Sequence, residues 1–275
     1  MMKLKRYKAI LFDGDGVLWK LNQPLPGIDP LFEFIREQEL KWALLTNNNT
    51  RTIEEYINKL GNFGISANNQ TVFSSSSAAT EYLLDRFGKG AQLHVIGMKG
   101  LTDTLLNAGF SITKGEEHPR DNTTAVVAGM DPQLNYKMVT IAVRLIQNGA
   151  AFIATNTDGT FPTPDGIFPG TGMVIGALQF ASGVEPYIAG KPHPAIFQSA
   201  LRNLEVEPVD SLMVGDRLQT DIQGAAAIGI HTAAVLTGIT SQEEIAQSKI
   251  KPDFIFDDLI HLHKALRKVY PVKQL

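Results

Sequence analysis

The sequence has no cysteine among its 275 residues, which excludes disulfides, a cysteine nucleophile and a thiolate metal site. Long apolar runs are missing too: no stretch approaches the ~18 residues of a membrane span. The apolar run behind the basic N-terminus stops at Asp13, which predicts no signal peptide. Nor is positive charge in excess, because 25 Lys and Arg against 28 Asp and Glu give a net charge of −3. We therefore expect a cytoplasmic protein that binds neither a membrane nor nucleic acid.

Short apolar runs alternate with segments of helical periodicity along the chain. Runs that predict strands cover residues 7–12, 42–45, 93–96, 124–127, 152–154, 211–214, 232–236 and 254–256. Helices are expected near residues 31–35, 53–60, 101–106 and 136–146, the second of them behind a capping box of Thr52 and Glu55. This alternation predicts an α/β fold with a doubly wound parallel sheet. In the middle of the chain the strand ends are less acidic, and a second α/β unit is expected there. Residues 158–172, rich in Gly, Pro and Thr, predict a long loop.

Polar residues follow several of the predicted strands. Because ligands of open α/β sheets bind outside the carboxyl ends of the strands, these residues are expected to meet. They are Asp13, Asp15, Thr46, Asn47, Lys191, Asp216 and Asp221. Carboxylates with a lysine and a hydroxyl suit phosphoryl transfer with a hard cation such as Mg²⁺, and an aspartate can accept the phosphoryl group.

The spacing of Asp13-Gly14-Asp15 adds to this interpretation. In an extended chain both carboxylates would project the same way, and Gly14 would let the backbone approach a phosphate. One carboxylate could then attack phosphorus while the other handles the proton of the leaving group. Alone, such a triplet is more often a turn or a fragment of a calcium loop.

The motifs resemble those of the haloacid dehalogenase-like (HAD) hydrolases. The matching segments are residues 12–18 (FDGDGVL), 45–47 (LTN), Lys191 and 215–221 (GDRLQTD). Residues 15–19 (DGVLW), 24–27 (PLPG), 45–48 (LTNN), 152–156 (FIATN) and 189–192 (AGKP) are similar to the p-nitrophenylphosphatase (NagD-like) branch. That branch carries an α/β cap inserted into a Rossmann-like core. The resemblance therefore implies a HAD core at residues 1–87 and 186–275, with a cap domain at 88–185.

The resemblance also implies roles for individual residues. Asp13 would be the nucleophile and a Mg²⁺ ligand, and Asp15 the acid/base that lends its backbone carbonyl to the metal. Asp216 would complete the metal ligands, and Asp221 would orient the lysine or metal-bound water. The phosphate would be bound by Gly14, Thr46, Asn47 and Lys191, the last of which stabilises negative charge. The presence of Asp15 favours phosphate chemistry over carbon–halogen cleavage.

These observations predict a Mg²⁺-dependent phosphatase that acts on a small phosphorylated metabolite. The resemblance implies p-nitrophenyl phosphate as a substrate in vitro, and a sugar phosphate, phosphoglycolate, glycerol phosphate or nucleotide in the cell. Contacts to the substrate from the cap are expected from Asp131, Tyr136, Asn156 and Asp158. A homodimer is a further expectation.

Three alternatives use parts of the same pattern. A phosphomutase would use the same aspartate but return the phosphoryl group to a sugar. A receiver-like signalling domain also combines aspartates with a Thr and a Lys, but this chain is too long for one such domain. An NAD-binding oxidoreductase would need Gly170, Gly172 and Gly176 to be a dinucleotide fingerprint, which their spacing does not match. A turn followed by a helix is expected there instead.

Overall fold

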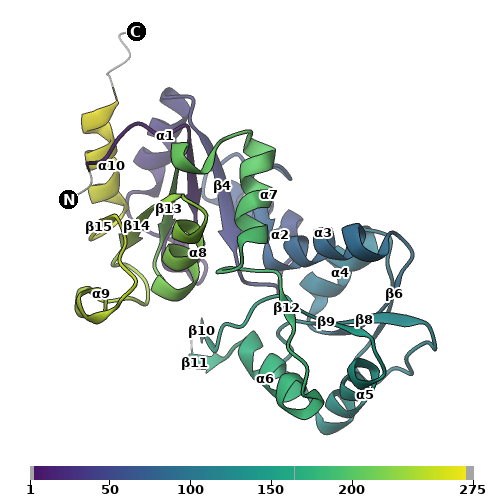
Figure 1. Cartoon of the computed structure of the whole chain (residues 1–275). Coiled ribbons are helices and arrows are strands. Elements are labelled where there is room, and N and C mark those ends of the chain that lie inside the picture. Colours follow the sequence, from purple (N-terminus) through teal and green to yellow (C-terminus); the bar gives the residue numbers. More distant parts are fainter. Residues whose placement is uncertain (1–2, 164, 271–275) are drawn as a thin grey trace. The chain divides into compact units, whose positions relative to one another are not determined.

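The computed structural model describes residues 3–163 and 165–270, and its contacts divide the chain into two compact units. The first unit combines the residues up to Thr46 with Tyr56–Phe73 and the residues from Lys191 onward. The second unit contains Asn47–Glu55 and Ser74–Gly190. The chain therefore leaves the first unit and returns to it, as Figure 1 shows by its colours.

The first unit is built on a six-stranded sheet in the order β15-β14-β13-β1-β4-β5. Its strands are β1 (Ala9–Phe12), β4 (Lys41–Thr46), β5 (Val72–Ser74), β13 (Ser211–Gly215), β14 (His231–Val235) and β15 (Phe254–Phe256). Strand β1 lies at the centre and pairs in parallel with β4 and β13. All four of its residues are buried, which explains why it is apolar throughout rather than alternating.

Helices cover both faces of this sheet. They are α1 (Ile28–Glu37), α2 (Ile53–Asn62), α7 (Pro194–Leu204), α8 (Gln223–Ala227), α9 (Gln242–Gln247) and α10 (Leu259–Val269). The chain runs from β1 to β4 in one direction and from β13 to β15 in the other, so right-handed crossovers place α1 and α8 on opposite faces. Helix α10 packs beside α1, and α7 beside α8 (Figure 1). The predicted doubly wound fold is confirmed.

The second unit has its own five-stranded parallel sheet, in the order β12-β9-β8-β6-β7. Its strands are β6 (Gln92–Ile96), β7 (Ser111–Lys114), β8 (Thr123–Ala128), β9 (Ala151–Ala154) and β12 (Tyr187–Ile188). Its helices are α3 (Ser75–Phe87), α4 (Lys99–Asn107), α5 (Tyr136–Gln147) and α6 (Thr171–Ser182). One face of the sheet buries an apolar cluster with α5 and α6, which includes Val126, Phe152 and Leu178.

Two features differ from the expectations. Residues 158–172 do not form one irregular loop: β10 (Thr160–Thr163) and β11 (Gly166–Pro169) pair as an antiparallel hairpin, so that prediction is wrong. Its strands are four residues long and carry prolines, which hid the strand pattern. By its contacts α3 groups with the second unit, whereas the sequence-based boundary at residue 87 leaves it with the core.

Among the described residues, no helix combines the length and the apolar character that crossing a membrane requires.

Candidate active site

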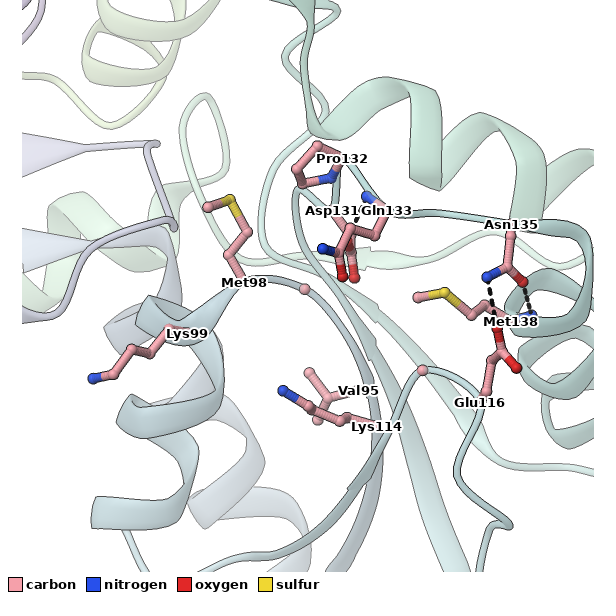
Figure 2. A pocket seen from close by; sticks show the side chains of 12 residues that line it. Val95, Met98, Lys99, Lys114, Glu116, Asp131, Pro132, Gln133, Asn135 and Met138 are labelled. Atoms are coloured by element: carbon pink, nitrogen blue, oxygen red, sulfur yellow. Dashed lines mark hydrogen bonds between the residues drawn. The ribbon is translucent and has the colours of Figure 1, made fainter.

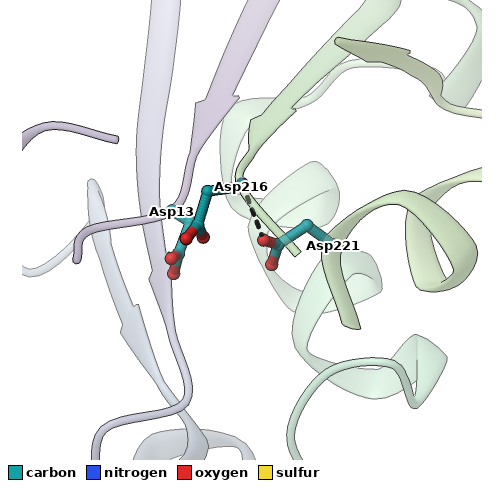
Figure 3. Close-up of side chains that lie close together, drawn as sticks. All are labelled: Asp13, Asp216 and Asp221. Carbon is teal, nitrogen blue, oxygen red and sulfur yellow. Dashed lines mark hydrogen bonds between the residues drawn. The ribbon is translucent and has the colours of Figure 1, made fainter. Parts of the chain in front are cut away.

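Three buried aspartates meet at the carboxyl edge of the first sheet. Asp13 follows β1 and Asp216 follows β13, and these strands pair in parallel with Phe12 opposite Val214. Asp221 enters from the π-helical turn Leu218–Ile222 (Figure 3). One carboxylate oxygen of each lies within 4.8 Å of the others. The structure thus brings together the aspartates that the sequence placed 203 and five positions apart, because parallel strands end at one edge.

Lys191 lies among these carboxylates and is itself buried. Its Nζ atom is 2.6 Å from Asp13 Oδ1 and 2.8 Å from Asp221 Oδ1, and it donates to the Leu45 carbonyl at 2.8 Å. Burial by itself would lower the pKa of Lys191, but the Asp13 and Asp221 carboxylates outweigh this effect and raise that pKa. Lys191 is therefore a fixed ammonium group beside the predicted nucleophile.

Burial also raises the pKa of Asp13, against the lowering effect of Lys191 and with further raising by Asp221 and Asp216. Three carboxylates around one ammonium leave an excess of negative charge in a site that excludes water. Such an arrangement is costly without a further cation. The site therefore favours either protonation or the binding of a metal ion.

The hydrogen-bond partners of the Asp216 carboxylate show whether a metal ion fits this site. Its Oδ2 accepts the N–H of Ile239 at 2.8 Å, but its buried Oδ1 has no hydrogen-bond partner in the described part of the chain. Burial, aided by Asp221, raises the pKa of Asp216 to about 7. Gly16 and Gly238 make room for this carboxylate, since a Cβ atom on either would overlap it. An orphaned carboxylate oxygen among hard oxygen donors fits a divalent cation.

Asp221 is held in place by the backbone next to Asp216. Its Oδ2 accepts the N–H groups of Asp216 and Arg217 at 3.2 and 3.1 Å, while its Oδ1 binds Lys191. A Cβ on Gly215 would overlap the Asp221 side chain, which explains the glycine. Asp221 thus contacts both a candidate metal ligand and the lysine, as its predicted orienting role requires.

Gly14 separates the two aspartates of the first motif, and Trp19 fixes its place. The chain bends at Gly14 and turns over residues 16–18, so the extended conformation assumed for Asp13 and Asp15 is wrong. The Gly14 carbonyl accepts the N–H groups of residues 17–19 at 3.3, 2.9 and 3.1 Å. The buried Trp19 indole lies against Gly14, where a Cβ would overlap the ring. Side-chain packing therefore demands this glycine. The motif DGVLW contains Trp19, but the sequence did not indicate that its ring packs on Gly14.

Two further side chains, Lys59 and Tyr56, pack against the Trp19 ring. Lys59 places its Nζ atom 4.1 Å from the ring centroid and donates to the Leu21 carbonyl at 2.6 Å. Tyr56 stacks on the indole with a centroid distance of 6.3 Å. Asp15 is half-buried in the turn that this cluster supports.

Thr46 and Asn47 follow β4 but differ in their surroundings. Thr46 is the buried last residue of β4, next to β1 in the first sheet. Asn47 groups with the second unit: its Nδ2 donates to Asp158 Oδ1 at 3.1 Å, and its carbonyl accepts from Asn156 Nδ2 at 2.6 Å and Ser75 Oγ at 2.7 Å. Two predicted substrate contacts, Asn156 and Asp158, thus hold Asn47 in this structure.

The other two predicted contacts of the cap lie elsewhere in the second unit. Asp131 follows β8 and lines a cavity there, and Tyr136 is 88% exposed at the start of α5. Asn156 and Asp158 thus bind Asn47, Asp131 lines the cavity, and Tyr136 lies on the surface of α5 without lining that cavity. Their role toward a substrate stays a prediction.

Gly170 and Gly172 pack against the backbone near Asp158 rather than forming a nucleotide cradle. A Cβ on Gly170 would overlap the Asp158 carbonyl, which also accepts the N–H of Gly172 at 2.9 Å. Helix α6 begins at Thr171, as expected for a turn followed by a helix.

Comparison with known proteins agrees with the fold and the site. The family described as haloacid dehalogenase-like hydrolase matches residues 10–111, and a HAD-hydrolase-like family matches residues 188–262. An acid sugar phosphatase of Staphylococcus saprophyticus is 34% identical over 265 residues, which cover 96% of this chain and 100% of the relative.

Solved structures give the same result. A p-nitrophenyl phosphatase from Archaeoglobus fulgidus superposes with a TM-score of 0.88 at 32% identity, over 95% of this chain and 100% of that one. A glycerol phosphate phosphatase from Mycobacterium tuberculosis in complex with magnesium has a TM-score of 0.84 at 31% identity, over 94% of this chain and 77% of that one.

The chain therefore belongs to the haloacid dehalogenase-like hydrolases. Among them it falls in the p-nitrophenylphosphatase-like branch, and it is an enzyme of the phosphatase class.

Proposed function

We propose that this enzyme is a Mg²⁺-dependent phosphatase that hydrolyses small phosphomonoesters through an aspartyl-phosphate on Asp13. The observation that carries the proposal is the Asp13 carboxylate, held 2.6 Å from Lys191 and beside Asp216 at the carboxyl edge of the sheet. A nucleophile there is oriented before substrate binds.

The residues divide the reaction among them. The Asp13 carboxylate attacks phosphorus in line with the leaving oxygen, and Asp15 gives that oxygen a proton as its bond to phosphorus breaks. Asp15 then takes a proton from a water molecule, which attacks the aspartyl-phosphate and restores Asp13. Lys191 offsets charge on Asp13 and the phosphoryl group, while Gly14, Thr46 and Asn47 bind phosphate oxygens.

Asp13, Asp216 and the Asp15 backbone carbonyl would hold the metal, and Asp221 would orient its surroundings. The bound cation supplies charge neutralisation for the transferring phosphoryl group. The orphaned Asp216 Oδ1 supports this assignment.

A small hydroxylated phosphate is the substrate class that the relatives support. They include an acid sugar phosphatase and a glycerol phosphate phosphatase. We therefore propose a sugar phosphate or glycerol phosphate as the substrate, with p-nitrophenyl phosphate as an artificial one. Contacts from Asp131, Tyr136, Asn156 and Asp158, the cytoplasmic location and a homodimer remain predictions.

Release of inorganic phosphate tests the proposal. The purified enzyme should release phosphate from p-nitrophenyl phosphate and from one or more of a panel of sugar and glycerol phosphates, and a chelator should abolish the release. Asp13→Asn should remove activity and prevent labelling of the protein by ³²P-substrate. Isomerised phosphate in place of free phosphate would identify a phosphomutase instead, and equal rates with chelator and with Mg²⁺ would refute the metal.

A further inference from the structure

The second unit has a topological switch point of its own. Its chain runs from β6 to β7 at one edge of the sheet and then crosses to β8 on the other side of β6. Helix α4 therefore leaves β6 toward one face and α5 leaves β8 toward the other. In open α/β sheets, the crevice at such a point, outside the carboxyl ends of the strands, is where ligands bind.

A cavity of about 500 Å³ lies at this place (Figure 2). It is lined by segments that follow the three strands: residues 97–99 after β6, residues 114–116 at the end of β7, and residues 131–133 after β8. Its volume is in the range of small-molecule sites. Every lining residue belongs to the second unit, so the cavity shares no residue with the acidic cluster.

Lys114 supplies the positive charge of this cavity. It is the last residue of β7, and its ammonium pairs with no carboxylate in the part of the chain that the structure describes. Of the other charged residues that line the cavity, Glu116 pairs with Lys137 at 3.0 Å and Lys99 pairs with Asp103, whereas Asp131 forms no ion pair in the described part of the chain. An anion that enters beside Lys114, on the side of the cavity away from Asp131, would therefore meet an ammonium group that no carboxylate binds.

The other sides of the cavity offer hydroxyl acceptors and apolar contacts. In Figure 2, Asp131 and Gln133 approach from one side, Lys114 from the opposite side, and the Met138 thioether from a third side, where α5 lies. Asp131 is held by the Gln133 N–H, which donates to Oδ1 at 2.9 Å. Carboxylate and amide oxygens accept bonds from hydroxyl groups. Val95, Met98 and Met138 add an apolar wall.

Helix α4 contributes a further preference for anions. It begins at Lys99 on this edge of the sheet, and its N-cap residue Met98 makes no side-chain hydrogen bond to the first turn. Met98 and Lys99 both line the cavity, so the amino end of α4 lies at its wall. The helix dipole is positive at this end and favours negative charge near it.

We propose that this cavity is a second, non-catalytic ligand site that binds a nucleoside monophosphate. Its phosphate pairs with Lys114, its ribose hydroxyls donate to Asp131 and Gln133, and its base lies on the methionine side chains. This inference does not rest on the proposed phosphatase mechanism, because no residue of the acidic cluster lines the cavity. It assigns Asp131, which the sequence predicts as a contact of the phosphatase substrate, to this second site instead.

Methyl NMR of methionine locates the binding. The full chain carrying Asp13→Asn, which suppresses hydrolysis, is labelled with ¹³C-methyl methionine and titrated with adenosine 5′-monophosphate in the presence of a chelator. Met98 and Met138 report on the cavity, and Met213, buried in β13, reports on the first sheet. Leu substitutions at Met98 and Met138 assign the two signals.

The Met98 and Met138 signals should shift saturably while that of Met213 does not. Adding Lys114→Ala should weaken this binding at least about tenfold through the lost charge-assisted contact. Adding Lys89→Ala should leave it unchanged, because Lys89 is an exposed lysine before the amino end of β6. Adenosine should bind at least about tenfold more weakly than the nucleotide.

Cavity signals that stay still throughout the titration would overturn the proposal, as would equal binding by the Lys114→Ala protein. A shift of Met213 alone would place the nucleotide in the first unit and also overturn it. Phosphate release by the Asp13→Asn protein would count against the proposed mechanism only, since the cavity signals are read separately.

Discussion

Two parallel sheets in this protein carry different chemistry at their carboxyl edges. In the first unit, Asp13, Asp216 and Asp221 surround the buried Lys191, and charge is concentrated where water is excluded. In the second unit, the edge carries a cavity and a hydrogen-bonded network in which Asn47 contacts Asn156 and Asp158. Both units are built on a parallel sheet flanked by helices. The chemistry of each edge is therefore decided by the residues that follow the strands and not by the sheet itself.

Removing the nucleophile should produce the largest difference between the two edges. Asp13→Asn should lower kcat at least about 10⁴-fold, because no other group can accept the phosphoryl group. Initial rates with p-nitrophenyl phosphate measure this effect, and circular dichroism checks the fold. Asp85→Asn, an exposed substitution on α3, is the control and should change the rate less than twofold. A rate within a few-fold of the parent in Asp13→Asn would remove the covalent mechanism.

The stability of the metal-free protein should depend on pH, because Asp216 at the carboxyl edge of the first sheet has a raised pKa. The pKa of Asp216 rises from 3.8 to about 7 on folding. At pH values between these two pKa values, the folded state therefore binds more protons than the unfolded state. The free energy of unfolding should therefore fall as pH rises from about 4 to about 7, by as much as about 4 kcal/mol.

Urea unfolding at several pH values, with a chelator, measures this slope. Saturating Mg²⁺ should reverse much of the loss at pH 7, since it binds the ionised carboxylates. Asp216→Asn should make the profile less steep, and the slope that remains belongs to Asp13, whose pKa is also raised. A metal-free protein that gains stability over this pH range would show that Asp216 is not protonated in the folded state.

Lys191 and Lys114 provide a direct comparison of the two edges. Lys191→Ala should raise the activation barrier by about 3 kcal/mol, because a preorganised charge beside the nucleophile is lost. Lys114→Ala should leave kcat for p-nitrophenyl phosphate within about twofold, since it lies outside the acidic cluster. Steady-state kinetics of both variants test this prediction. An equal loss of kcat in the two variants would show that the two edges do not differ in their role in the reaction.

The smallest effect is expected at the hydrogen bond between Asn47 and Asp158 within the second unit. Asp158→Ala removes the acceptor of the Asn47 amide, which should cost about 1 kcal/mol of stability. It should also raise KM, because Asn47 is a proposed phosphate ligand. Urea unfolding and kinetics measure the two effects. Asp165→Ala, exposed between the hairpin strands, is the matched control. An unchanged KM with reduced stability would assign Asp158 a structural role only.

The pattern of strands and their polar ends was readable from the sequence. Apolar runs ending in Asp13, Thr46 and Asp216 predict the acidic edge, because every strand of a parallel sheet ends at the same side. The α/β class, the second α/β unit and the family followed from the same residues. These features depend on local order along the chain, which a sequence displays directly.

Contacts between distant segments needed the tertiary structure. Nothing in the sequence linked Trp19 to Gly14, Gly238 to the Asp216 carboxylate, or Asp158 to the Asn47 amide. The hairpin of residues 160–169 and the cavity beside Lys114 were hidden for the same reason. Residue types and spacing determine which groups stand at the end of a strand. Side-chain packing across the fold decides which of them touch, and that depends on shapes that no local pattern records.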